Sequence, residues 1–134
     1  MKASIITILC CSLLMVVSCS KPSNTASSGG KGGKAVLSII PEHHGGYVDT
    51  CMVYIKYGTN DAPANGIYDD STKCVMNDTI PVAIFSGLKV GSYYLFAVGL
   101  HPPYLPPNVK GGIPCPIQIE DSIQIYLPTF TYTP

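Results

Sequence analysis

The pattern of apolar and polar positions from residue 35 onward is typical of β-strands. Apolar runs of five to ten residues alternate with turn residues, and inward candidates such as Cys51, Val53 and Ile55 recur with a period of two. Gly and Pro interrupt most windows, so a long helix is not expected. The pattern predicts an all-β domain, a seven-stranded two-sheet β-sandwich, with strands at Ala35–Ile40, Val48–Tyr57, Tyr68–Val75, Ile80–Phe85, Gly91–Leu100, Gly112–Ile119 and Ser122–Thr133.

Three segments refine this pattern. Gly91–Leu100 is apolar on both faces, which predicts a central strand. The preceding stretch, Ser86–Gly91, is expected to be a tight turn with Leu88 pointing inward. The segment His101–Asn108 contains four prolines and can support neither a helix nor a sheet ladder, so it is predicted to be a loop.

The first 34 residues contain a different kind of signal. Lys2 precedes the apolar run Ala3–Val17, which is shorter than the ~20 residues that a membrane-spanning helix needs and is typical of a secretory signal peptide. Val16-Val17-Ser18-Cys19 resembles the bacterial lipobox. That resemblance implies cleavage after residue 18 and a lipid on Cys19; the alternative is ordinary signal cleavage, with Cys19 a simple thiol.

The residues after Cys19 fit a lipid anchor. They are rich in Ser, Gly and Lys as far as Lys34, which predicts a flexible tether, so the expected organisation is signal peptide 1–18, lipidated Cys and tether 19–34, and β domain 35–134. In such lipoproteins an acidic residue after the cysteine favours the inner membrane, and this position is Ser20. We therefore expect a lipid-anchored protein of the outer membrane, on the periplasmic face rather than the cell surface.

Charge and motif content exclude several function classes. Eight Lys balance eight acidic residues and there is no Arg, so nucleic acid is not an expected partner. No G-x-S-x-G motif or paired catalytic groups occur, and we expect no enzymatic activity and no cofactor.

Two groups of residues were weighed as metal ligands. His43 and His44 are adjacent and could converge only with help from His101, and a solvated turn is the preferred interpretation. A run of oxygen-bearing side chains lacks the spacing of a calcium-binding EF-hand loop, and no metal is expected there: Asp61, Asn65, Asp69, Asp70 and Asp78.

The mature domain retains three cysteines, Cys51, Cys74 and Cys115. An oxidising envelope favours one bridge and one leftover thiol. If Tyr57 lies opposite Tyr68 in a hairpin, Cys51 lies opposite Cys74, at a Cα separation of about 4.5 to 5.5 Å that a disulfide accepts. This register predicts a Cys51–Cys74 disulfide, while Cys51–Cys115, Cys74–Cys115 and no bridge stay open as alternatives.

The proline-rich loop is the most suggestive surface feature. Its prolines would present Tyr104 and Leu105 on a stiff stem, which makes the two residues a candidate partner-binding loop for an envelope protein or a glycan. The alternative is a rigid loop that packs over an open end of the sheets.

Three motifs carry a resemblance that covers nearly all of the mature domain. They are Val53-Tyr54-Ile55-Lys56-Tyr57-Gly58-Thr59, the series from Phe85 to Leu95 with Gly87-Leu88-Lys89 and Tyr93-Tyr94, and Gly111-Gly112-Ile113-Pro114. The chain resembles small Gram-negative lipoproteins with a carboxypeptidase-regulatory-like, prealbumin-type domain. The resemblance implies an immunoglobulin-like or prealbumin-like sandwich.

These features predict a non-catalytic envelope lipoprotein that serves as a protein-interaction or structural module. The alternative is a lipoprotein that binds a carbohydrate or small ligand through exposed Tyr residues, such as Tyr47, Tyr57 or Tyr68. An interaction module would use a broad patch, whereas the alternative requires a concave aromatic site.

Overall fold

The structure is a computed structural model that describes residues 28–134. The predicted signal peptide, Cys19 and the tether as far as residue 27 lie outside the described residues. The described part of the chain consists of strands and loops, and none of it forms a helix long and apolar enough to cross a membrane. Its ten strands are β1 Lys31–His43, β2 Gly46–Tyr47, β3 Thr50–Tyr57, β4 Asp70–Lys73, β5 Val75–Asn77, β6 Ile80–Leu88, β7 Tyr93–Leu100, β8 Asn108–Pro114, β9 Ser122–Pro128 and β10 Phe130–Thr131.

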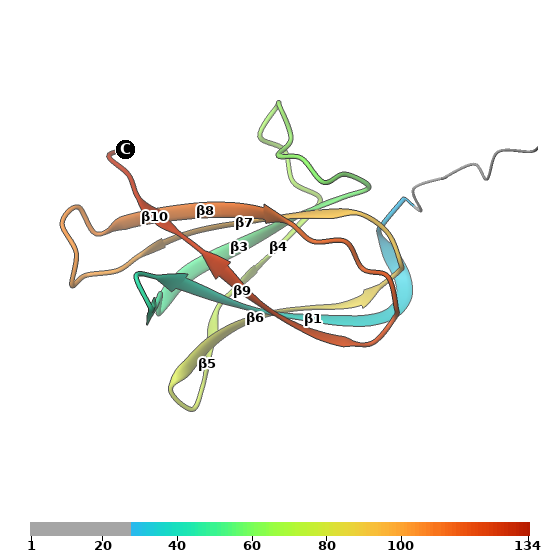
Figure 1. Ribbon diagram of the computed structural model, residues 1–134, viewed down its shortest axis with the longest axis horizontal. Helices are drawn as coiled ribbons and strands as arrows, with labels where there is room; N and C mark the ends of the chain where they lie inside the picture. Colours follow the sequence, from blue (N-terminus) through green and yellow to red (C-terminus); the bar gives the residue numbers. More distant parts are fainter. Residues whose placement is uncertain (1–27) are drawn as a thin grey trace, which may run out of the picture.

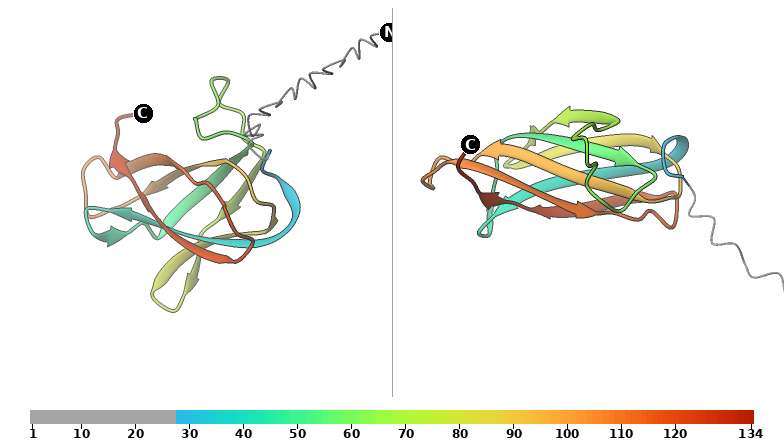
Figure 2. Two further views of the ribbon diagram at one scale, coloured as in Figure 1. Left: turned by 45° about the vertical axis from the view of Figure 1, so that its right-hand side comes forward. Right: turned by 90° about the horizontal axis from the view of Figure 1, so that it is seen from above.

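The strands form two sheets that lie face to face (Figures 1 and 2). In the first sheet β1 pairs with β6 on one side and β9 on the other, β6 also pairs with β5, and the short β2 folds back on the end of β1. The second sheet has the order β10-β8-β7-β3-β4. All pairs are antiparallel except β1 with β9, which is parallel. The all-β prediction is confirmed, but the strands number ten rather than seven.

The core lies between the two sheets and follows the predicted period of two. Leu37 and Ile39 on β1 face Val53 and Ile55 on β3, and all four are fully buried. Burial of apolar surface contributes about 25 cal/mol per Å² to stability, so the contact between these two sheet faces is the main stabilising interaction. The predicted inward positions Leu88 and Cys51 are confirmed as buried, and Leu127 and Cys115 are buried as well.

The predicted strand Tyr68–Val75 is confirmed only over Asp70–Lys73, which forms β4, because the chain changes sheets at Cys74. β4 pairs with β3 in the second sheet, whereas β5 pairs with β6 in the first, and Cys74 lies between them. A segment that leaves one sheet for the other cannot be a single ladder. The alternation in this window therefore belongs to two short strands.

The predicted last strand divides in the same way. β9 pairs with β1 and β10 pairs with β8, and the chain crosses at the buried Thr129, whose backbone N–H and Oγ1 both donate to the Glu42 carbonyl, at 2.7 and 2.9 Å. Gly111 lets the two sheets approach here, since a Cβ at this position would lie 2.1 Å from the Pro128 carbonyl oxygen. The strands on either side of each crossing are outer strands, so each crossing joins an edge of one sheet to an edge of the other.

Two further boundaries differ from the prediction. β6 continues through the expected tight turn to Leu88, which pairs with Ala35 of β1. The predicted strand Gly112–Ile119 instead begins at Asn108 and ends at Pro114, because Pro114 and Pro116 have no backbone N–H for a ladder. The prediction of a central strand at Gly91–Leu100 is confirmed by β7, and the predicted loop His101–Asn108 is confirmed except for Asn108, which begins β8.

Candidate functional site

The outer face of the second sheet carries the richest set of side chains available to a partner. Along β3 and β7 the buried residues Val53 and Leu95 alternate with Tyr54 and Phe96, which are only partly buried. Strand geometry sends alternate side chains to opposite faces, so the second set points away from the core. Apolar and aromatic residues thus occupy a face that is in part exposed to solvent.

Three adjoining hollows lie on this face, and together we call them the aromatic groove. The first, of about 380 Å³, and the second, of about 260 Å³, share Tyr54, Gly66 and Tyr68. The second and the third, of about 230 Å³, share Val98. The remaining lining residues are Asp69, Asp70 and Ser71 in the first hollow, Phe96 in the second, and Thr50, Cys51, Met52, Lys73, Gly99, Leu100, Asn108 and Tyr132 in the third.

Three aromatic rings form one end of the groove. Tyr68 stacks on Phe96 with ring centroids 5.7 Å apart and an interplanar angle of 11°, and Tyr54 lies 5.5 Å from Tyr68. Burial, with a smaller effect of Tyr94, raises the pKa of Tyr68, so its hydroxyl is protonated and available as a donor at neutral pH. Gly66, in the loop above, has a positive φ of 68° and leaves open space where a side chain would be.

Two carboxylates border this end. Asp69 accepts hydrogen bonds from Lys56 Nζ at 3.0 Å and from the Tyr57 N–H at 2.7 Å. Burial alone would raise the pKa of Asp69, but the two donors outweigh burial and lower it. Asp70 pairs with Lys31 at 3.3 Å. Both carboxylates are therefore balanced by lysines.

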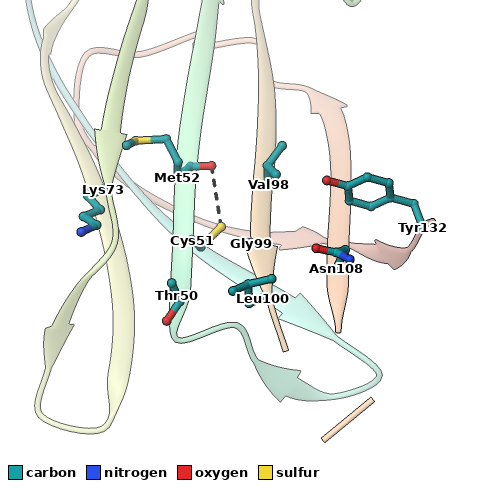
Figure 3. A pocket seen from close by; sticks show the side chains of 9 residues that line it. All are labelled: Thr50, Cys51, Met52, Lys73, Val98, Gly99, Leu100, Asn108 and Tyr132. Atoms are coloured by element: carbon teal, nitrogen blue, oxygen red, sulfur yellow. Dashed lines mark hydrogen bonds between the residues drawn. The ribbon is translucent and has the colours of Figure 1, made fainter. Parts of the chain in front are cut away.

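The far end of the groove is the third hollow, whose lining residues come from β4, β3, β7 and β8 and from Tyr132 beyond β10. There the Lys110 ammonium lies 4.3 Å from the centroid of the Tyr132 ring, in a cation–π contact. Figure 3 shows Tyr132 and Asn108 on one side of this hollow and Lys73 with Met52 on the other. The dashed line in that view is the weak contact from Cys51 Sγ to the Met52 carbonyl, at 3.7 Å.

The predicted cysteine register is confirmed, whereas no disulfide is formed in the structure. Met52 lies opposite Lys73, so Cys51 lies opposite Cys74, and the Cys74 N–H donates to the Cys51 carbonyl at 2.9 Å. Cys51, Cys74 and Cys115 are all free thiols. The hydrogen bond between the Cys51 and Cys74 side chains lowers the pKa of Cys74 and, together with burial, raises that of Cys51.

The histidines and Tyr104 form a second cluster at one end of the molecule. The structure brings His43 and His101 together, with their Nδ1 atoms 3.1 Å apart. Tyr104 packs its ring 4.6 Å from His43 and 5.3 Å from His44. Tyr104 is thus half-buried in this cluster, while Leu105 is 92% exposed. The partner-binding role of the pair stays a prediction.

Of the five candidate calcium ligands, Asp61, Asn65 and Asp78 lie in turns or bends, whereas Asp69 directly precedes β4 and Asp70 begins it. Asn65 accepts from the Ile67 N–H at 3.0 Å, and Asp78 has a positive φ of 59° between β5 and β6. Such local bonds and left-handed conformations are common roles for these residue types. Within residues 28–134 no three His, Cys, Asp or Glu side chains are arranged to hold a metal ion.

Sequence reasoning missed Tyr54, Phe96 and Tyr132 as site residues. The apolar character of both faces of Gly91–Leu100 correctly indicates a central strand, but it does not show that one of these faces is partly exposed to solvent. The apolar residues at the outward positions of this strand were the signal in the sequence for the groove, because two of them, Phe96 and Val98, form its floor. Tyr132 gave no comparable signal in the sequence.

Comparison with protein-family models, with curated proteins and with solved structures finds no match for this chain.

Proposed function

We propose that this chain is a non-catalytic envelope lipoprotein whose β domain is an interaction module. Lipid on Cys19 would hold it at the outer membrane, on the periplasmic face, and the outer face of the second sheet would bind the partner. The order of signal run, lipobox and tether supports the anchor. The observation that carries the binding role is the aromatic groove, since solvent-facing Tyr and Phe side chains are typical of binding surfaces.

The sandwich type is part of the proposal. We assign an immunoglobulin-like or prealbumin-like arrangement, as the resemblance to carboxypeptidase-regulatory-like domains implies. Seven of the ten strands have four or more residues, and the three shorter ones, β2, β5 and β10, extend or bridge them. Two sheets that lie face to face, with antiparallel pairing except between β1 and β9, support this assignment.

The path of the chain supports an orientation in which the proline-rich loop points away from the lipid anchor. The described chain enters beside the β6–β7 turn, where the Lys89 N–H donates to the Gly30 carbonyl at 2.9 Å. β7 then runs to the opposite end, where the loop with Leu105 lies (Figure 1). With the lipid on Cys19, Leu105 would lie at the end of the domain remote from the entering chain.

Two measurements test this proposal. Mass spectrometry of the membrane fraction is expected to find Cys19 as the lipidated N-terminus, and Cys19→Ala is expected to release or mislocalise the domain. Affinity capture of the tagged lipoprotein from crosslinked cells is expected to recover a stable envelope partner, and Tyr54→Ala or Tyr68→Ala in the groove is expected to reduce the yield. An unmodified Cys19 in the soluble periplasm contradicts the anchor, and an unchanged yield contradicts the groove.

A second candidate function is the binding of a carbohydrate or other small ligand. This function requires a concave aromatic site rather than a flat patch. The hollow shared by Tyr54, Tyr68 and Phe96 favours it.

A further inference from the structure

The aromatic groove is elongated rather than round. Its three hollows adjoin through shared residues, from Asp69 at the start of β4 to Tyr132 beyond β8. Along β3 the lining runs from Tyr54 in the first hollow to Thr50 in the third, and four residues at about 3.4 Å each give a length of roughly 14 Å. An extended ligand of several units fits this outline better than a single small molecule.

One end of the groove provides flat aromatic surface. Tyr54, Tyr68 and Phe96 lie within 6.4 Å of one another by ring centroid. Aromatic faces carry partial negative charge, and they attract the partially positive C–H groups on the flat side of a pyranose ring. The Tyr132 ring, at the far end, provides a second surface of the same kind.

Polar groups line the groove at intervals between and beside these rings. Ser71 and Asp70 border the first hollow, and Thr50 and Asn108 border the third. Hydroxyl, amide and carboxylate groups can pair with sugar hydroxyls, which both donate and accept. Asp69 and Asp70 are each paired with a lysine, so the end of the groove at Tyr54 and Tyr68 has no unbalanced carboxylate. At the far end Lys73 lines the third hollow and the Lys110 ammonium lies over the Tyr132 ring, and both ammonium groups can donate to sugar hydroxyls.

We propose that the aromatic groove binds a linear, uncharged oligosaccharide, with one sugar ring against Tyr54 and Tyr68 and a later ring near Tyr132. This inference rests on the proposed binding role of the domain and specifies its ligand. Every pyranose ring presents a flat face of C–H groups to an aromatic ring, whereas a peptide does so only through particular side chains, so the glycan is the better match to two separated aromatic surfaces.

The test is the dependence of affinity on ligand length. The full mature lipoprotein in detergent is titrated with cellotetraose, chitotetraose and maltotetraose, and with the disaccharide of each, by calorimetry. At least one tetrasaccharide is expected to bind at least tenfold more tightly than its disaccharide. No binding, or a smaller ratio for all three sugars, overturns the proposal.

Substitutions locate the site. Tyr68→Ala is expected to remove binding of both lengths, whereas Tyr68→Phe, which keeps the ring, is expected to retain it. Tyr132→Ala is expected to weaken the tetrasaccharide at least fivefold and leave the disaccharide unchanged. Tyr126→Ala, on the other sheet and 51% exposed, is the matched control. Circular dichroism checks that each variant is folded, and an effect of Tyr126→Ala equal to that of Tyr68→Ala overturns the assignment.

The outcomes separate this inference from the proposed function. If no glycan binds but crosslinking captures an envelope protein at the groove, the interaction module stands and the glycan is wrong. If a tetrasaccharide binds and Cys19 carries no lipid, the glycan stands and the anchor is wrong.

Discussion

The Tyr93 hydroxyl accepts a hydrogen bond from the Gly30 N–H at 2.8 Å, although the two residues lie 63 positions apart. The same hydroxyl lies 2.7 Å from the Lys89 carbonyl, to which it donates, and 3.1 Å from the Gly30 carbonyl. Tyr93 is fully buried. The Tyr93 hydroxyl thus links the segment at Gly30, which leads into β1, to the β6–β7 turn at Lys89, while the Tyr93 ring is buried in the core.

Tyr93→Phe is expected to destabilise the domain while leaving its packing intact. The Gly30 N–H and the Lys89 carbonyl would lose a partner, and an unmade hydrogen bond of this kind costs about 1–3 kcal/mol. Urea unfolding measures the change. The exposed Tyr126 hydroxyl, which accepts only from Gln124 Nε2 in its own strand, provides the control Tyr126→Phe, with an expected effect within about 0.5 kcal/mol. Equal losses in both variants would contradict the role of Tyr93.

Cys51 and Cys74 are expected to form a disulfide when the protein is oxidised. Directly opposed, hydrogen-bonded residues in an antiparallel pair have Cα atoms about 5.5 Å apart, which a disulfide accepts. We expect oxidised glutathione to convert the two thiols to a Cys51–Cys74 disulfide and to release two molecules of reduced glutathione. In the chain-entropy model the closed loop would add about 3 kcal/mol to the free energy of unfolding.

Non-reducing peptide mapping checks the pairing. Cys115→Ser is the control, because the linked peptide is expected to form without Cys115. Recovery of Cys115 in the linked peptide would show that the pairing is wrong.

The reduced protein is expected to show unequal thiol reactivity. Burial raises the pKa of Cys115 to about 11, so little thiolate is present at pH 8, and this thiol is also shielded. Cys74 is partly exposed, and the hydrogen bond from Cys51 lowers its pKa. Alkylation followed by mass spectrometry should label Cys74 first, and Cys115 only slowly until urea is added. Equal rates in the native protein would contradict this order.

The strands of the core could be predicted from the sequence because their signal is local. Alternation at Cys51, Val53 and Ile55 identifies the inward face of β3, and the hairpin register placed Cys51 opposite Cys74 correctly. The sheet crossings at Cys74 and Thr129 were missed. They depend on which distant strand each half pairs with, and a period of two does not contain this information.

The aromatic groove could likewise be predicted only in part from the sequence. Tyr54 and Phe96 were visible as outward positions on two expected strands, but their meeting with Tyr68 requires the loop to return over the sheet. The sequence did indicate that His43 and His44 need His101 to form a cluster. The contact between His43 and His101 depends on the fold of the proline-rich loop. In this loop the Tyr104 N–H donates to the His101 carbonyl at 3.0 Å.

The last prediction concerns the pH dependence of stability. His43 is 1% exposed, and its Nε2 atom has no hydrogen-bond partner in the structure. Burial, together with His44 and His101, lowers the pKa of His43 below its ordinary value. Tyr104 also packs on the ring, and neither ion pair of the described residues involves a histidine. Protonated His43 therefore has no carboxylate to compensate its charge.

The sign follows from proton linkage. The unfolded chain takes up a proton at His43 near pH 6.5, whereas the folded chain does so only at lower pH. The free energy of unfolding is therefore expected to fall as the pH drops below about 6.5 and to level off below the folded pKa. Urea unfolding between pH 7.5 and pH 5 measures this slope. His43→Phe should reduce this change in unfolding free energy with pH, whereas His44→Asn should keep most of it. Asn is chosen because residue 44 has a φ of 50°, which Asn tolerates. A full slope in His43→Phe would show that another group is responsible.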